Sequence, residues 1–256
     1  MKTPVKTPKT VWIAVLALIF FAGSAAAGDW GRETEDYRET FALSAGGEIV
    51  LENINGDVTV EAWDRDEVEV AYTKRARTRE GLERVEVVIE ERGGRLDIET
   101  EYLRNGRSND GGSVDFTLQV PRKAYLELDL VNGSLKVTGH EGRISADLVN
   151  GSLEAEIAGE AELSTVNGKM DVTVTDTTAG QRLELDSVNG GLTLRLPAGV
   201  DADVEAETVH GSISNDFGIP VDKGRYVGRS MRGTIGGGGV DIELSNVNGS
   251  IKILSE

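Results

Sequence analysis

The sequence predicts an all-β protein, a β-solenoid preceded by an N-terminal module of antiparallel strands. Apolar and polar residues alternate over long stretches, as in residues 126–130, and a period of two is typical of strands with one buried face. Glycine is abundant, with 32 residues among 256, whereas aromatic residues make up 5%. A short tripeptide also recurs along the second half of the chain, which indicates a repeat architecture.

Residues 1–27 have the pattern of an export signal. Lys2, Lys6 and Lys9 form a basic start, an apolar run covers residues 11–23, and small residues end at Ala27. This order is typical of a secretory signal peptide. The apolar run is short for a membrane span, which needs about 20 residues. We therefore expect cleavage after Ala27 and an exported protein, with an uncleaved membrane anchor as the alternative.

Two segments precede the repeats. Residues 28–44 are expected to be a linker. Residues 45–125 predict a strand module, with four antiparallel strands between Trp63 and Pro121, that covers the N-terminal end of the solenoid. Such a cover is needed because the bare end of a solenoid is an open sheet edge.

The repeat consists of a β-branched residue, an asparagine and a glycine. The spacings between successive glycines are 77, 18, 17, 22, 21 and 38 residues. The first spacing places the first copy in the longer N-terminal module, and the last is close to two repeats. The central residues of the copies are Asn55, Asn132, Asn150, Asn167, Asn189, His210 and Asn248.

Asn-Gly can mark a two-residue hairpin or the corner of a solenoid coil. In a hairpin, the residue two before Asn faces the residue three after it on one side of the sheet. The later position is apolar in all seven copies, but the earlier position is polar in five. A solenoid avoids this mismatch by stacking like residues, with an asparagine ladder at the corner and glycine supplying a positive φ. We therefore predict a solenoid over residues 126–256, with a loop insertion at about 215–239.

Several motifs around the repeat resemble a known family. Residues 56–60 read Gly-x-Val-x-Val and lead to Trp63-Asp64, and a strand ends at Val120-Pro121. Residues 248–253 read Asn-Gly-x-Ile-x-Ile. These features are similar to the bacterial putative-adhesin family of β-strand-repeat envelope proteins, a domain of unknown function. The resemblance covers residues 48–254 and implies a secreted or envelope-associated repeat protein linked to adhesion and envelope stress. It implies no catalytic residues.

Acidic residues occupy the position three before the corner residue in five of seven copies. In a solenoid they stack at roughly 4.8 Å, and like charges at that distance repel by about 1 kcal/mol per pair even in water. Clustered carboxylates suit Ca²⁺ or Mg²⁺. The sequence therefore suggests a weak Ca²⁺ stripe through Asp129, Asp147, Asp186 and Glu207, with a solvated acidic face as the alternative and no other cofactor.

Charge and composition exclude some functions. The net charge of −17 argues against nucleic-acid binding, and the chain has no cysteine for a disulfide, a thiolate metal site or a lipid anchor. We expect a non-catalytic, exported protein that acts as an adhesin-like or scaffold binding module for an envelope glycan, lipid or membrane protein. The alternatives are a polysaccharide-active enzyme on a β-helix and an envelope-stress regulator that binds a membrane partner.

Overall fold

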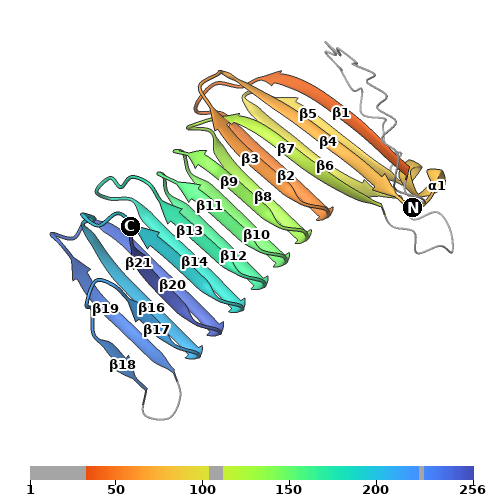
Figure 1. Ribbon diagram of the computed structural model, residues 1–256. Helices are drawn as coiled ribbons and strands as arrows, with labels where there is room; N and C mark the ends of the chain where they lie inside the picture. The colour runs from red at the N-terminus through yellow and green to blue at the C-terminus, as the bar shows by residue number, and fades with distance from the viewer. Residues whose placement is uncertain (1–32, 104–111, 225–227) are drawn as a thin grey trace, which may run out of the picture.

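The computed structural model describes residues 33–103, 112–224 and 228–256, and the predicted signal peptide lies outside them. The described residues form two large sheets (Figure 1). Sheet A has the spatial order β1 (Glu33–Ala42), β4 (Glu67–Ala76), β7 (Ser113–Pro121), β3 (Val58–Trp63), β9 (Leu135–His140), β11 (Leu153–Ile157), β13 (Met170–Val174), β15 (Leu192–Leu196), β21 (Ile251–Ser255) and β17 (Ile213–Asn215).

Sheet B lies opposite sheet A. Its spatial order is β18 (Val221–Lys223), β19 (Arg229–Ile235), β16 (Ala202–His210), β20 (Val240–Asn248), β14 (Arg182–Asn189), β12 (Ala161–Asn167), β10 (Ile144–Asn150), β8 (Tyr125–Asn132), β2 (Glu48–Asn55), β6 (Arg95–Tyr102) and β5 (Val85–Arg92). One short helix, α1 (Arg79–Glu83), is capped by Thr78, whose side chain accepts a hydrogen bond from the Gly81 amide at 3.1 Å. No helix among the described residues is long and apolar enough to cross a membrane.

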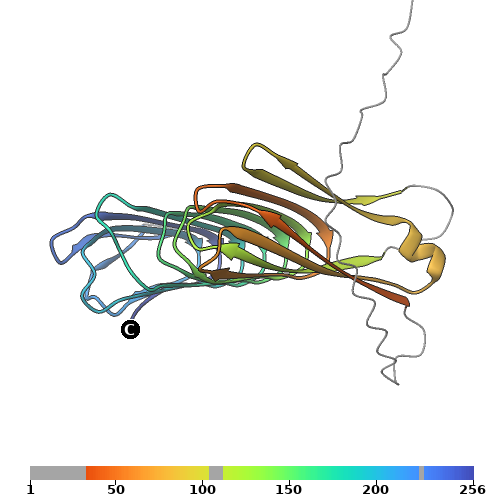
Figure 2. The ribbon, with the colours of Figure 1, turned by 90° about the horizontal axis from the view of Figure 1, so that it is seen from above.

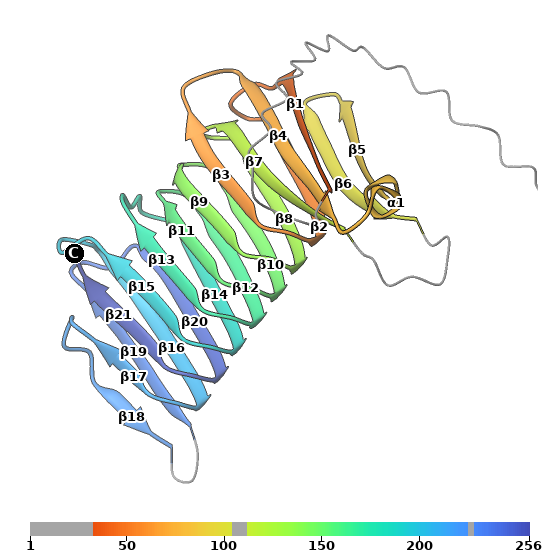
Figure 3. The same cartoon turned by 45° about the vertical axis from the view of Figure 1, so that its right-hand side comes forward.

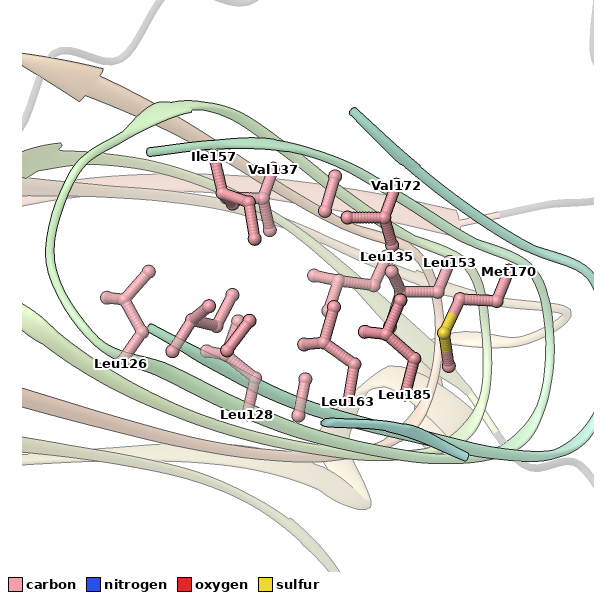
Figure 4. Close-up of a cluster of buried hydrophobic side chains, with 14 of the residues drawn as sticks. Leu126, Leu128, Leu135, Val137, Leu153, Ile157, Leu163, Met170, Val172 and Leu185 are labelled. Carbon is pink, nitrogen blue, oxygen red and sulfur yellow. The ribbon is translucent and has the colours of Figure 1, made fainter. Parts of the chain in front are cut away.

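Each coil of the solenoid contributes one strand to each sheet. Figure 2 shows the two sheets as the long sides of a flattened coil. Alternate residues point inward, as in β20, where every second side chain is buried. The inward side chains of the two sheets meet in one core, where Leu126 and Leu128 of β8 face Val137 of β9 and Ile157 of β11 (Figure 4). Burial of this apolar surface holds the two sheets together.

The corner tripeptides stack in parallel register, as the solenoid prediction requires. Asn132 pairs with Asn55 on one side and with Asn150 on the other, and the pairing continues through Asn167 and Asn189. The corner backbone extends the same parallel ladder, since the Gly151 amide donates to the Asn167 carbonyl at 3.0 Å. The all-β solenoid is confirmed, and the hairpin alternative is excluded because equivalent corners lie side by side.

The N-terminal part differs from its prediction in two ways. Glu33–Ala42, expected within a linker, is strand β1, which pairs antiparallel with β4 along its whole length. The strand module is mixed rather than antiparallel. Its strands β6 and β7 continue the parallel stack beside β2 and β3, whereas β1, β4 and β5 add antiparallel pairs at the end.

The first Asn-Gly copy therefore belongs to the solenoid. Its coil, β2 and β3, lies directly beside the coil of β8 and β9, although 77 residues separate the two corners. The prediction that this copy sits in a separate module is wrong. The intervening chain leaves the stack at β4, forms the end cover, and returns through β7 to β8.

The last two coils are stacked out of sequence order. Strand β20 pairs with β14 on one side and with β16 on the other, so the C-terminal coil lies between the coils of Asn189 and His210 (Figure 3). The segment 215–239, expected to be a loop, includes strands β18 and β19 among its described residues. Strand β19 pairs antiparallel with the outer side of β16 and covers this end of sheet B.

Candidate binding surface

The corner asparagines form a hydrogen-bonded ladder along the solenoid. Each side-chain amide donates through Nδ2 to Oδ1 of its neighbour, at 2.9–3.0 Å, over five consecutive steps. An asparagine can continue such a ladder because its side chain both donates and accepts. In spatial order the ladder contains Asn55, Asn132, Asn150, Asn167, Asn189 and Asn248.

His210 occupies the end of this ladder. His210 pairs with Asn248 in the strand register, and the His210 carbonyl accepts a hydrogen bond from the Gly249 amide at 3.0 Å. Among the described residues, its ring makes no hydrogen bond to Asn248. The backbone of His210 thus continues the corner ladder, and the predicted role of its side chain stays a prediction.

A row of exposed β-branched side chains lies next to the ladder, one residue before each corner. The exposed fractions of these side chains run from 39% to 47%, although the side chains are apolar. At about 4.8 Å per strand, the seven residues extend roughly 29 Å along the solenoid. We call this set the valine row, which in spatial order is Ile54, Val131, Val149, Val166, Val188, Val247 and Val209.

The predicted acidic residues lie on the same outer face, two positions further from the corner. Strand pairing puts the acidic row in the order Glu52, Asp129, Asp147, Ser164, Asp186, Ser245 and Glu207. Burial raises the pKa of Asp129 and of Asp186, and neighbouring carboxylates raise both further. A hydrogen bond from Ser245 lowers the pKa of Asp186 and partly offsets these effects.

The next row outward, the arginine-paired row, has a different environment. Its members in spatial order are Glu127, Ser145, Glu162, Glu184, Glu243 and Glu205. Arg182 lies 3.1 Å from the Glu184 carboxylate and 2.9 Å from that of Glu243, Arg143 lies 3.6 Å from Glu162, and Arg232 pairs with Glu205. By contrast, none of the five carboxylates of the acidic row forms an ion pair with a described lysine or arginine.

Two further features lie outside these rows. A shallow groove crosses the outer face of sheet B near its C-terminal end, between Arg182, Asp203, Arg232 and Glu243. His140 is fully buried at the far end of β9, and burial lowers its pKa to about 4. The backbone groups of Arg143 and Ala124 oppose this shift, although neither ring nitrogen has a partner with hydrogen-bond geometry.

The structure brings Asp129 and Asp147 onto adjacent strands, but Ser164 separates Asp147 from Asp186, and Ser245 separates Asp186 from Glu207. No group of three or more His, Asp or Glu side chains in the described ranges could together hold a metal ion. The Ca²⁺ stripe stays a prediction.

Sequence reasoning treated the β-branched column as a stacking feature and missed its exposure. The signal was present, because residues one, three and five before the corner share one parity along the strand and therefore one face.

Comparison with known proteins identifies a matching family and a solved structure of similar fold. A family model described as Toastrack DUF4097 matches residues 123–254. A crystal structure of a putative cell adhesion protein from Clostridium sporogenes is 13% identical with a TM-score of 0.55, covering 87% of this chain and 100% of that chain. At this identity, the likeness shows a shared fold alone. No curated protein matches the chain.

Two other solved structures are more distant. One is a putative adhesin from Bacteroides fragilis, 9% identical over 86% of this chain and 97% of that chain, with a TM-score of 0.31. The other is a putative lipid binding protein from Parabacteroides distasonis, 11% identical over 90% and 98%, with a TM-score of 0.25. Neither score supports an argument about fold or function. The family match covers just over half of the sequence and agrees with the stacked register of its corners, so this chain belongs to the Toastrack DUF4097 family.

Proposed function

We propose that this protein is exported and acts in the cell envelope as a non-catalytic binding module, adhesin-like or scaffold in role. The observation that carries the proposal is the outer face of sheet B, where the valine row and the acidic row run side by side over seven coils and the asparagine ladder runs beside six of them. Such a face offers a long, regular contact surface on a rigid scaffold. The lysines and the apolar run of residues 1–27 support export.

The titratable groups of this surface also suit binding better than catalysis. The carboxylates lie in rows on a sheet face, and four of the five in the arginine-paired row are held by Arg143, Arg182 and Arg232. His140 is buried away from the surface. We propose that the partner is an envelope glycan, lipid or membrane protein.

Export is tested by expressing the full chain and fractionating the cells. We expect the protein in the envelope or medium, with a mature N-terminus at Gly28. A chain lacking residues 1–27 is the control and should stay inside the cell. Retention of the full chain in the cytosol would contradict the proposal.

Binding is tested by incubating the exported protein with purified envelope polysaccharide, lipid vesicles and solubilised membrane proteins. Saturable retention by one fraction supports the proposal. Release of reducing sugar ends from the polysaccharide would instead favour the enzyme alternative. If no fraction retains the protein, the binding proposal fails.

A further inference from the structure

The valine row is an apolar strip that the described chain leaves uncovered. Seven β-branched side chains, each exposed by 39–47%, follow one another in register on adjacent strands. Scattered surface apolar residues need no explanation, but a contiguous strip rimmed by polar side chains is typical of an interaction site. The strip is continuous, because parallel pairing keeps equivalent residues side by side from coil to coil.

The charges beside the strip define the chemistry of its occupant. The acidic row runs parallel to the valine row, two positions further from the corner, and its five carboxylates have no ion-pair partner among the described residues. In the arginine-paired row, two positions further again, four of the five carboxylates have an arginine partner. Free negative charge is therefore concentrated next to exposed apolar surface, and a partner that places cations over the acidic row gains electrostatic complementarity.

We propose that the valine row and the acidic row together bind a cationic amphipathic segment of a partner polypeptide. Apolar side chains of the segment cover the valine row, and lysines or arginines on one flank reach the acidic row. A helix of about 20 residues spans roughly 30 Å, which matches the length of the row. This inference rests on the proposed function as a binding module and adds the class of partner and the surface that binds it.

Charge disfavours two other occupants. A second copy of this chain would bring its own acidic row and a net charge of −17 to the same strip. An anionic lipid surface would place its headgroups against the unpaired carboxylates of Asp129, Asp147 and Asp186. Like charges in close contact oppose both arrangements.

The probe is a labelled 20-residue helical peptide of leucine and lysine, with leucines on one face and lysines on its flanks. One control peptide has the same composition in an order without an apolar face, and another carries glutamate in place of lysine. Binding to the exported protein is measured by fluorescence anisotropy at low and high salt. We expect saturable binding of the patterned peptide, at least about tenfold tighter than of either control.

Two triple variants test the two rows separately. Val149→Thr with Val166→Thr and Val188→Thr keeps β-branched side chains and removes apolar contact. Asp129→Asn with Asp147→Asn and Asp186→Asn removes three unpaired charges at nearly constant shape. The matched control, Glu162→Gln with Glu184→Gln and Glu243→Gln, removes three charges from the arginine-paired row.

We expect each test variant to bind the patterned peptide about tenfold more weakly, or weaker still, than the unchanged protein does. The asparagine variant should also lose most of the salt dependence. The affinity of the control variant for the patterned peptide should stay within about threefold of that of the unchanged protein. Circular dichroism and thermal melting establish that each variant is folded. If the triple threonine variant is not folded, the single Val166→Thr substitution replaces it.

Several results would overturn the inference. Equal binding of the patterned and scrambled peptides, or equal loss in the asparagine and control variants, would indicate general attraction to an acidic protein. Self-association or binding to anionic vesicles that the threonine variant abolishes would assign the strip to a second copy or to lipid. Binding of the unchanged protein to an envelope fraction, with no peptide binding and no effect of either variant, would leave the proposed function standing and refute this surface.

Discussion

The corner glycines are required by close approach more than by backbone conformation. Positive φ was the expected reason, and Gly56, Gly151, Gly190 and Gly249 do have φ between 125° and 157°. Gly133 and Gly168 lie outside the range of positive φ that side chains rarely adopt, yet they are glycine too. A Cβ at either position would lie 1.7–1.9 Å from the carbonyl oxygen of the corner glycine in the preceding coil. The stacked backbones leave no room for a side chain.

Gly168→Ala tests this close approach without a change of backbone region. The added methyl meets a backbone atom, the Gly151 oxygen, which cannot move without breaking the corner ladder. We expect a loss of about 1–3 kcal/mol in the free energy of unfolding, measured by urea denaturation. The control is Gly46→Ala, where nothing lies within 4 Å of the new Cβ. Equal stability of the two variants would contradict the account.

His140 makes the stability depend on pH. Its folded pKa of about 4 lies below the ordinary value of 6.5, so the unfolded chain takes up the proton first as the pH falls. Stability from this group is complete above about pH 6.5 and is lost as the pH falls toward 4, by about 3 kcal/mol at most.

His140→Ile should remove this loss. Ile157 occupies the paired position in the next coil, so isoleucine fits the row. Urea titrations between pH 7 and pH 4 should show a smaller decline in the free energy of unfolding for the variant. An identical decline in both proteins would show that His140 is not the titrating group.

At the scale of the strand, one face carries two kinds of acidic row. Alternation decides which residues are exposed, and the register decides which carboxylates meet. Asp129 and Asp186 remain without cations, whereas Glu184 is paired with Arg182. A carboxylate therefore has opposite effects on stability at positions two residues apart.

Asp129→Asn with Asp186→Asn is expected to stabilise the protein at pH 7 by a few tenths to about 1 kcal/mol. Each carboxyl has a folded pKa above its ordinary value, so its charged form costs stability above that folded pKa. The cost is relieved as the pH falls through the raised pKa toward the unfolded value, and the gain of the variant should vanish there. Thermal melts at pH 7 and pH 4 measure the gain in stability and its disappearance.

Glu205→Gln is the control for this pair, because it removes a carboxylate that Arg232 already compensates and that does not shift the pKa of Asp129 or Asp186. We expect no gain, or a small loss, at pH 7. A gain as large as that of the asparagine variant would mean that general acidity, not the unpaired row, limits stability.

Over the whole molecule, the C-terminal coil holds the His210 coil in place. Strand β20 lies between β14 and β16, and β16 in turn supports β19. Asn248 continues the amide ladder from Asn189, while His210 sits at its end, where no further asparagine follows.

A chain that ends at Gly239 lacks β20 and β21 and should lose the structure of strands β16 to β19. We expect these residues to exchange their amide hydrogens rapidly, because β16 loses its parallel partner. Residues 125–174 should remain protected and serve as the internal reference. Retained protection of β16 would mean that it can pair directly with β14.

Much of the architecture could be predicted from local patterns. Period-two alternation identified strands such as β8, and the mismatch between Thr165 or Ser187 and their apolar hairpin partners excluded a meander. Strands β1, β18 and β19 were missed because strands at the ends of the sheets have few buried side chains and little apolar alternation. The exposure of the valine row could be read from the parity of its positions along the strand, but not from composition, since valine is ordinarily a core residue.

The repeat by itself determined the solenoid, its parallel register and the identity of the residues that stack at each corner. It did so because Asn, Gly and the alternating apolar positions act locally, within one coil and its neighbour. Tertiary structure alone decided the order of the coils, the place of the first copy, and which carboxylates obtain an arginine. Equivalent repeats present nearly the same edge to any neighbour, so the connecting chain and the ends of the stack select among pairings that the tripeptides do not distinguish.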